Sequence, residues 1–255
     1  MRAEYPILEF DTARTAIIEP AKVLKPVDGM PERCVLPIYH GVIAGLQEKN
    51  LLTRVTDIGT AMGSMPVYRM VHAGIPVAVA HPGLGAPFAA AVLEEMIAFG
   101  GRKFIACGSA GVLDSGLAKG TVVVPSAAVR DEGTSYHYAT PSRDIAAQAD
   151  VIKVVRRVLE DRGVPFQVGK TWTTDALYRE TMRRIADRKS EGCLTVEMEC
   201  AAFLAVAAFP GVRFGQLLAT GDDVSGTEWD PRHTEEHSTF PERVFWLSVE
   251  ACVKL

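Results

Sequence analysis

The chain has 255 residues, of which 48% are hydrophobic and 23% are charged, and it carries a formal net charge of −4. This length suits one α/β domain with a large core, so we expect a single domain over residues 1–255. The acidic balance argues against a nucleic-acid partner. Because no apolar run is long enough for a membrane span or a signal peptide, we expect a soluble, cytoplasmic protein.

Short β-branched runs alternate with helical stretches along the chain, a pattern typical of an α/β fold with a largely buried sheet. The predicted strands are, in chain order, 16–18, 65–71, 76–80, 103–106, 121–124, 166–171, 194–197 and 214–220. The predicted helices are 38–49, 88–99, 145–162, 178–188, 200–209 and 240–254. The clearest helix is the second, because Pro87 occupies its opening turn and Gly100-Gly101 end it.

Glycine-containing loops follow three of the predicted strands, at residues 81–87, 107–111 and 220–226. In open α/β sheets, ligands bind where the carboxyl ends of strands meet such loops. Glycine lets backbone N–H groups approach an anion, and a serine such as Ser109 adds a hydroxyl donor. One such loop is usually only a turn, but three in one chain favour a binding site.

Two acids flank a methionine in the segment Val196-Glu197-Met198-Glu199, just before an apolar helical run. In an extended strand Glu197 and Glu199 face the same side, so both could reach one polyhydroxylated ligand. A carboxylate beside vicinal hydroxyls can hold a ribose through charge-assisted hydrogen bonds. Alternatively, both acids lie in solvent in the first turn of a helix, where the macrodipole favours them. The local pattern leaves both interpretations open.

The cysteines and histidines give no sign of a metal site. Five cysteines occur at scattered spacings, without a CxxC or HExxH pattern, and Cys107 and Cys200 lie in apolar stretches typical of buried free thiols. His233 and His237 are four residues apart and could share a helix face as metal ligands. Charged residues lie between them, which favours a helical face exposed to solvent.

In combination, these segments resemble the nucleoside phosphorylase family, which includes purine nucleoside and uridine phosphorylases and related nucleosidases. The matching pieces are 83–87, 108–111, 129–137, 196–199 and 221–222, in the family's order. The resemblance implies an α/β fold with a mixed central sheet that curls into a distorted barrel flanked by helices. It also implies phosphorolysis of a nucleoside to free base and ribose 1-phosphate, with inorganic phosphate as co-substrate and no other cofactor. Dimers assembled into a hexamer are the implied oligomer.

The resemblance assigns the sugar and the base to particular residues. Glu199 and Met198, with Glu197 beside them, would hold the ribose, and Glu199 would accept hydrogen bonds from the 2′- and 3′-hydroxyls. Cleavage passes through an oxocarbenium-like sugar, whose positive charge nearby carboxylates stabilise. Trp172 and Gly111 would lie at the base.

Asp222 falls where the purine branch of the family has its general acid. Such an acid would protonate N7 of a leaving purine, and it should be largely shielded from water. The alternative is an aspartate that only stabilises a turn or a helix start. The base class stays open: Asp222 favours a purine, whereas the 130–137 stretch looks more like the uridine phosphorylase branch. We lean towards a purine, and we expect His137 to be a surface residue.

The phosphate site departs from the family pattern. Gly108 and Ser109 match, but the arginine two residues before Gly-Ser is replaced by Ala106. The family's Gly-Asp-Pro-x-Arg loop was matched to residues 18–22, where Lys22 stands for the arginine. A lysine lacks the planar fork that grips phosphate at two points. Because related hydrolases also lack the first arginine, a nucleosidase that uses water, or a non-catalytic nucleoside-binding relative, remains an alternative.

Overall fold

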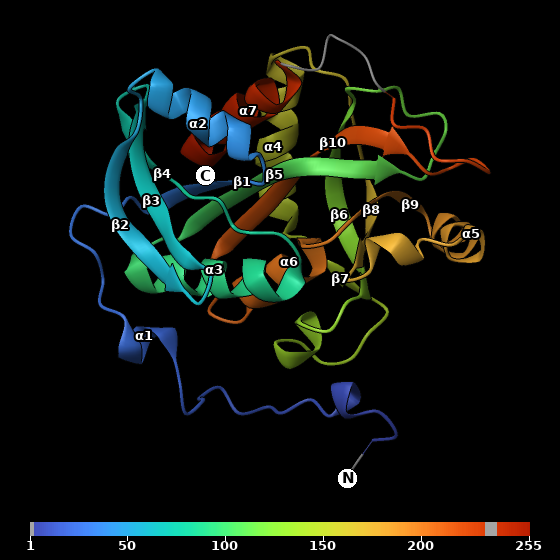
Figure 1. Ribbon diagram of the computed structural model, residues 1–255, viewed down its shortest axis with the longest axis horizontal. Helices are drawn as coiled ribbons and strands as arrows, with labels where there is room; N and C mark the ends of the chain where they lie inside the picture. The colour runs from blue at the N-terminus through green and yellow to red at the C-terminus, as the bar shows by residue number, and fades with distance from the viewer. Residues whose placement is uncertain (1–2, 233–238) are drawn as a thin grey trace.

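A ten-stranded mixed sheet forms the centre of the computed structural model, which describes residues 3–232 and 239–255 (Figure 1). The predicted pair His233 and His237 lies outside the described residues. The strands are β1 (Arg33–Pro37), β2 (Thr53–Thr60), β3 (Gly63–His72), β4 (Ile75–Val79), β5 (Lys103–Val112), β6 (Val122–Asp131), β7 (Asp144–Ala146), β8 (Phe166–Thr174), β9 (Cys193–Glu197) and β10 (Arg213–Asp223).

Helices pack on both faces of the sheet. The helices are α1 (Pro20–Val23), α2 (His40–Glu48), α3 (Ala86–Phe99), α4 (Ala149–Asp161), α5 (Met182–Ser190), α6 (Cys200–Ala208) and α7 (Phe240–Lys254). One hydrophobic cluster joins α2, α4 and α7 to the sheet, and a second joins α3 and α6 to the other face. In the described part of the chain, no helix combines the length and the hydropathy needed to cross a bilayer.

Five strands close into a barrel, in the order β5, β9, β8, β6 and β10, and β10 pairs back onto β5. This arrangement confirms the predicted α/β fold with a curled mixed sheet. On the other side of β5, strands β1 and β4 continue the sheet in parallel, so β10, β5, β1 and β4 end at one common edge. Loops that follow these strands are therefore brought together.

The predicted elements differ from the observed ones in several places, and strands β5 and β6 are much longer than predicted. Residues 16–18 form no strand, and Ile17 is fully exposed, because β-branched residues form a strand only where a neighbouring strand can pair with them. Strands β1, β2 and β7 were not predicted. The predicted helix 145–162 begins later, at Ala149, because Ile145 pairs with Ala128 in β7. The helix predicted from residue 178 begins at Met182, where Thr181 caps α5.

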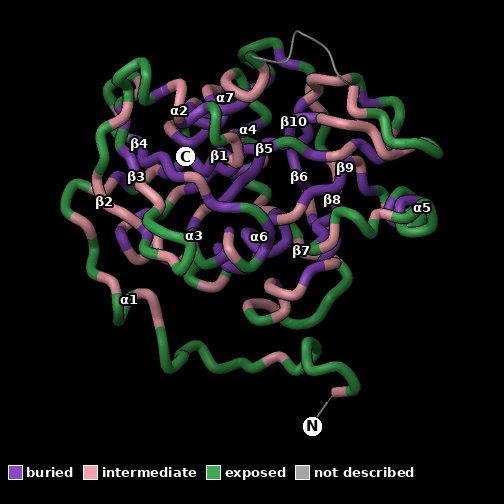
Figure 2. Tube along the Cα trace, in the orientation of Figure 1, coloured by how far each residue is buried: buried purple, intermediate pink, exposed green. Residues whose placement is uncertain are grey.

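The N-terminal segment before β1 lies outside the body of the fold. It runs past α3 and α6 and is mostly exposed (Figures 1 and 2). A cavity of about 620 Å³ separates it from the C-terminal half of α3, and His137 and Tyr138 line the same cavity. His137 is exposed, as expected for a surface residue. All five cysteines are free and buried, which confirms the prediction for Cys107 and Cys200.

Candidate active site

The side chain of Glu197 accepts hydrogen bonds from backbone N–H groups at the start of helix α6. Its Oε2 accepts hydrogen bonds from the backbone N–H groups of Glu199 at 2.8 Å and Cys200 at 2.7 Å, and its Oε1 accepts one from Oγ1 of Thr173 at 2.6 Å. The side chain is buried. The helix-start interpretation is therefore right about the position of Glu197 and wrong about its exposure to solvent. Glu197 satisfies backbone donors that would otherwise be unpaired.

Glu199 has a different hydrogen-bond partner. It is 3% exposed, and its Oε1 accepts a hydrogen bond of 2.6 Å from the N–H of Gly85, which precedes α3. Gly85 has a φ of 85°, a conformation that favours glycine. This contact ties the loop after β4 to the loop after β9. Because one carboxylate can accept several hydrogen bonds, Oε2 of Glu199 retains capacity for a ligand hydroxyl.

The two acids interact electrostatically. Burial, followed by the negative charge of Glu199, raises the pKa of Glu197 to about 8. Burial also raises the pKa of Glu199, although the N–H of Gly85 acts in the opposite direction. The side chain of Met198 is only partly buried between these two acids. Raised carboxyl pKa values in a buried pair are characteristic of functional sites, although ion networks in structural positions show them too.

Strand β9 brings this acidic segment next to β5. Val196 pairs with Gly111, and a side chain at Gly111 would come within 2.9 Å of Cγ1 of Val196. The same side chain would lie 3.8 Å from Oδ1 of Asp222, and one at Gly221 would lie 3.7 Å from Cβ of Ser109. Ser109 is exposed and Asp222 is half-buried. The close approach of these backbones therefore gathers Ser109, Asp222 and the start of the acidic segment around one corner, which is open to solvent at Ser109.

Asp222 is less shielded than we expected. It is half-buried at the end of β10, and its Oδ2 accepts a hydrogen bond of 2.7 Å from the indole N–H of Trp229, a residue that is itself exposed. A second acid lies nearby: burial, and then the charge of Asp222, raise the pKa of Glu180 to about 7. The sequence analysis did not single out Glu180, since nothing local marks an acid after a short turn.

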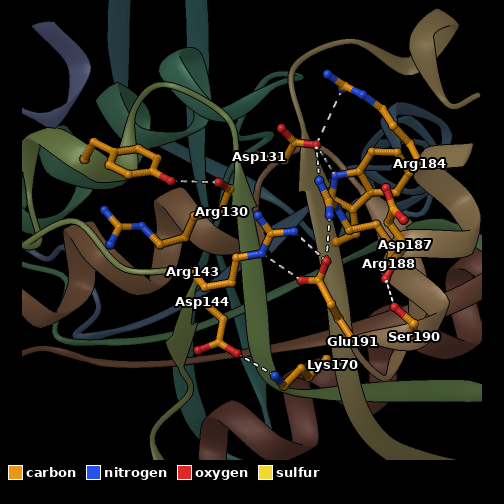
Figure 3. Close-up of polar contacts among 12 residues, drawn as sticks. Arg130, Asp131, Arg143, Asp144, Lys170, Arg184, Asp187, Arg188, Ser190 and Glu191 are labelled. Atoms are coloured by element: carbon orange, nitrogen blue, oxygen red, sulfur yellow. Dashed lines mark hydrogen bonds and ion pairs between the residues drawn. The ribbon is translucent and has the colours of Figure 1, made fainter. Parts of the chain in front are cut away.

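Trp172 does not border this open corner, contrary to its predicted role at the base. Its side chain is completely buried, and its indole N–H donates to Oδ2 of Asp131 at 3.0 Å. Asp131 also accepts from Arg188 at 3.0 Å and pairs with Arg184, as Figure 3 shows. Because side chains alternate along β8, Trp172 faces the core under α5 while Thr173 faces Glu197. Trp172 therefore contributes to the site only indirectly, by packing in the core against Val196 of β9.

Lys22 is not brought to Ser109 within the protomer, so its predicted position is wrong. It lies on α1 and forms an ion pair of 2.9 Å with Glu19. The segment around it lines the outer cavity with Glu94, Ile97 and Ala98, roughly 13 Å or more along α3 from Gly85. The segment instead found beside Gly108 is the end of β1: a side chain at Gly108 would lie 3.2 Å from Cδ1 of Ile38.

The loop formed by residues 130–137 is ordered by contacts among its own residues and with Thr140. Arg130 is buried and donates to Oγ of Ser135 at 2.8 Å and to the carbonyl of Thr140 at 2.6 Å, and its guanidinium stacks on Tyr136. Glu132 accepts from the backbone N–H of Ser135 at 2.9 Å. These contacts explain the segment as an ordered loop. Among the described residues, no three His, Cys, Asp or Glu side chains lie close enough together to hold a metal ion.

Comparisons with known proteins identify related sequences. A model of the phosphorylase superfamily matches residues 39–244. Over 196 residues the chain is 27% identical to a guanosine phosphorylase of Halorubrum lacusprofundi, covering 74% of this chain and 81% of that protein. It is 30% identical over 195 residues to a DeoD-type purine nucleoside phosphorylase of Myxococcus xanthus, covering 74% and 78%.

A solved structure shows the same fold. The uridine phosphorylase of Vibrio fischeri superposes with a TM-score of 0.73 at 20% sequence identity, covering 91% of this chain and 95% of that one. The superfamily match spans well over half of the chain and includes the segments that form the corner of Ser109, Glu199 and Asp222. The protein therefore belongs to the phosphorylase superfamily.

Proposed function

We propose that the protein is a nucleoside phosphorylase, which cleaves the N-glycosidic bond of a nucleoside with inorganic phosphate and releases the free base and ribose 1-phosphate. The observation that carries this proposal is the buried carboxylate of Glu199, fixed on one side by Gly85 and borne on the segment that follows Val196, which packs beside Gly111 and Asp222. The phosphorylases among its relatives support inorganic phosphate, rather than water, as the nucleophile.

The geometry suits a sugar that becomes positively charged. In our proposal, Oε2 of Glu199 accepts from the ribose hydroxyls and Met198 packs against the sugar. As the bond to the base lengthens, the carboxylate stabilises the oxocarbenium-like ribose, and its effect is large because Glu199 itself is shielded from water. Glu197 does not touch the substrate in this scheme. It holds the turn that aims Glu199.

We further propose a purine as the leaving base, with Asp222 as the acid that protonates N7. Glu180 supports this choice, because a second acid beside Asp222 can supply a proton at neutral pH. Gly111 lies beside Asp222, where only glycine fits against Val196, and we propose that its backbone borders the base. Gly108 and Ser109 would donate to phosphate.

Phosphate dependence is the first test of this proposal. We expect release of hypoxanthine from inosine to fall at least about 100-fold in phosphate-free buffer, because water is a poor nucleophile where a bound anion is positioned to attack. The measurement is ultraviolet detection of the free base, with uridine as the comparison substrate. Undiminished release without phosphate would rule out phosphorolysis.

Hydrolysis is the second candidate, and Ala106 is the observation that favours it. Ala106 is completely buried in β5 between β1 and β10. Because alanine carries no charge, this position supplies no cation to an anion near Ser109. A nucleosidase would release ribose instead of ribose 1-phosphate, and product analysis in the same assay separates the two. Binding of inosine without any release would favour a non-catalytic relative.

A pH profile tests the role of Glu180. Because its pKa is raised to about 7, it is protonated below that pH and charged above it. We expect kcat/KM for inosine to fall about tenfold per pH unit above 7. In Glu180→Gln this fall near pH 7 should disappear, whereas Glu160→Gln, an exposed control on α4, should keep it. A Glu180→Gln profile that still falls at pH 7 would contradict the role.

We also propose a cytoplasmic homo-oligomer, with dimers assembled into a hexamer. Apolar side chains that are exposed in the protomer support an interface: Ile17, Ile18 and Val23 all lie in the N-terminal segment. A neighbouring subunit could then complete the open corner of the site.

A further inference from the structure

Two histidines that the scheme above does not use lie at the same edge of the sheet as Ser109. His40 begins α2, directly after β1, and His81 follows β4. Strand β1 lies between β4 and β5 and runs parallel to both, so the three strands end side by side. The backbone N–H of Ile38 donates to the carbonyl of Cys107 at 2.7 Å, which joins the end of β1 to β5 just before Gly108 and Ser109.

The two imidazoles are neighbours, tilted by 55° to each other, and one has a defined tautomer. Their ring centroids are 6.4 Å apart. Nδ1 of His81 accepts a hydrogen bond of 2.9 Å from the N–H of Gly83, so in the neutral ring the proton is on Nε2. His81 is half-buried and His40 is exposed. His81 therefore offers an N–H donor whose direction is set by its own loop.

The backbone at this edge also favours an anion. Helix α2 begins here, and its N-cap residue Tyr39 provides no side-chain cap, whereas the start of α3 already meets the carboxylate of Glu199. Unpaired N–H groups and the helix dipole attract negative charge at such ends. Burial, and then the proximity of His40, lower the pKa of His81, as expected where two imidazoles compete for positive charge.

We propose that His40 and His81 hold the anionic nucleophile, inorganic phosphate, together with Ser109. In this arrangement Nε2–H of His81 and the ring of His40 donate to phosphate oxygens and replace the arginine that Ala106 cannot supply. The inference rests on the proposed function for the identity of the nucleophile. The anion site itself rests on the placement of the two histidines.

Two substitutions of His81 separate its possible roles. Asparagine places an oxygen close to the position of Nδ1, so His81→Asn keeps an acceptor for Gly83 and removes the Nε2–H donor. Glutamine places an amide close to the position of Nε2, so His81→Gln keeps a donor and loses the contact with Gly83. If His81 binds phosphate, the KM for phosphate should rise about tenfold or more in His81→Asn and less in His81→Gln. A purely structural role predicts the opposite order.

His40→Gln should also raise the KM for phosphate. The KM for inosine should change less than about twofold, because in our proposal His40 binds only phosphate. His137→Gln, on the outer surface, is the matched control. Circular dichroism and thermal unfolding show whether each variant is folded. An unchanged KM for phosphate in both His40→Gln and His81→Asn, in an enzyme that requires phosphate, would overturn the inference.

Calorimetric titration with inorganic phosphate distinguishes failure of the inference from failure of the proposed function. If the wild type releases base without phosphate but still binds phosphate, and His81→Asn does not, the anion site stands and phosphorolysis fails. If the wild type requires phosphate, and a variant carrying both His40→Gln and His81→Asn binds phosphate as tightly as the wild type, the anion site is elsewhere and phosphorolysis stands. Absence of phosphate binding in the wild type would refute both.

Discussion

Replacing Glu199 by glutamine should lower kcat/KM for nucleoside cleavage about 10³-fold while the protein remains folded. Glutamine can keep an oxygen for the N–H of Gly85, so the link between the β4 and β9 loops survives. It removes the negative charge that would face the developing positive charge on the sugar. Removing one preorganised electrostatic contact from an active site commonly costs about 10²–10³ in rate.

The measurement is steady-state kinetics with inosine and saturating phosphate, accompanied by thermal unfolding. Glu95→Gln is a suitable control, because this acid is also partly buried, with its pKa raised by burial, and it lies further along α3. A Glu199→Gln enzyme that keeps kcat/KM within about threefold of wild type would remove Glu199 from the mechanism.

Replacing Glu197 by alanine should instead destabilise the fold, by about 3 kcal/mol. The substitution leaves the N–H groups of Glu199 and Cys200 and the hydroxyl of Thr173 without their acceptor in a buried site. Unsatisfied buried donors cost about 1–3 kcal/mol each, and partial relaxation reduces the sum. Urea denaturation at a fixed protomer concentration measures the change, since oligomers unfold in a concentration-dependent way. A loss below about 0.5 kcal/mol would show that the cap is dispensable.

The Glu197→Gln variant tests the charge of the same group. The pKa of Glu197 is about 8 in the folded protein, against an ordinary value of 4.5, so folding takes up a proton between these values. Protonated Glu197 therefore stabilises the wild type at low pH. The free energy of unfolding of the wild type should fall as pH rises from about 5 through 8, because this stabilisation is lost. Glutamine does not titrate, so its stability relative to the wild type should increase over that range. Parallel stability curves for the two proteins would contradict the raised pKa.

Much of the fold follows from local patterns in the sequence. Buried strands such as β5 are continuous apolar runs, and the helix 240–254 agrees with α7 at both ends. Of the three predicted glycine loops, 81–87 follows β4 as expected, whereas 107–111 belong to β5 and 220–223 to β10, because pairing with neighbouring strands extends both strands. Local signals failed at β1 and at residues 16–18, where the formation of a strand depends on a neighbour distant in the sequence.

The residue types at the site were visible in the sequence, but their roles were not. Glu197 and Glu199 look equivalent two residues apart, yet one caps α6 and the other binds Gly85, which is 114 residues away. Trp172 is buried because the alternation of β8 points it under α5. The sequence thus determined which groups are available and in which order the main strands follow, whereas β5, β6, β8 and β10 all extend beyond their predicted ends. Only the tertiary structure decided which donors each carboxylate meets, because those contacts are made between loops that pack together only when the sheet forms.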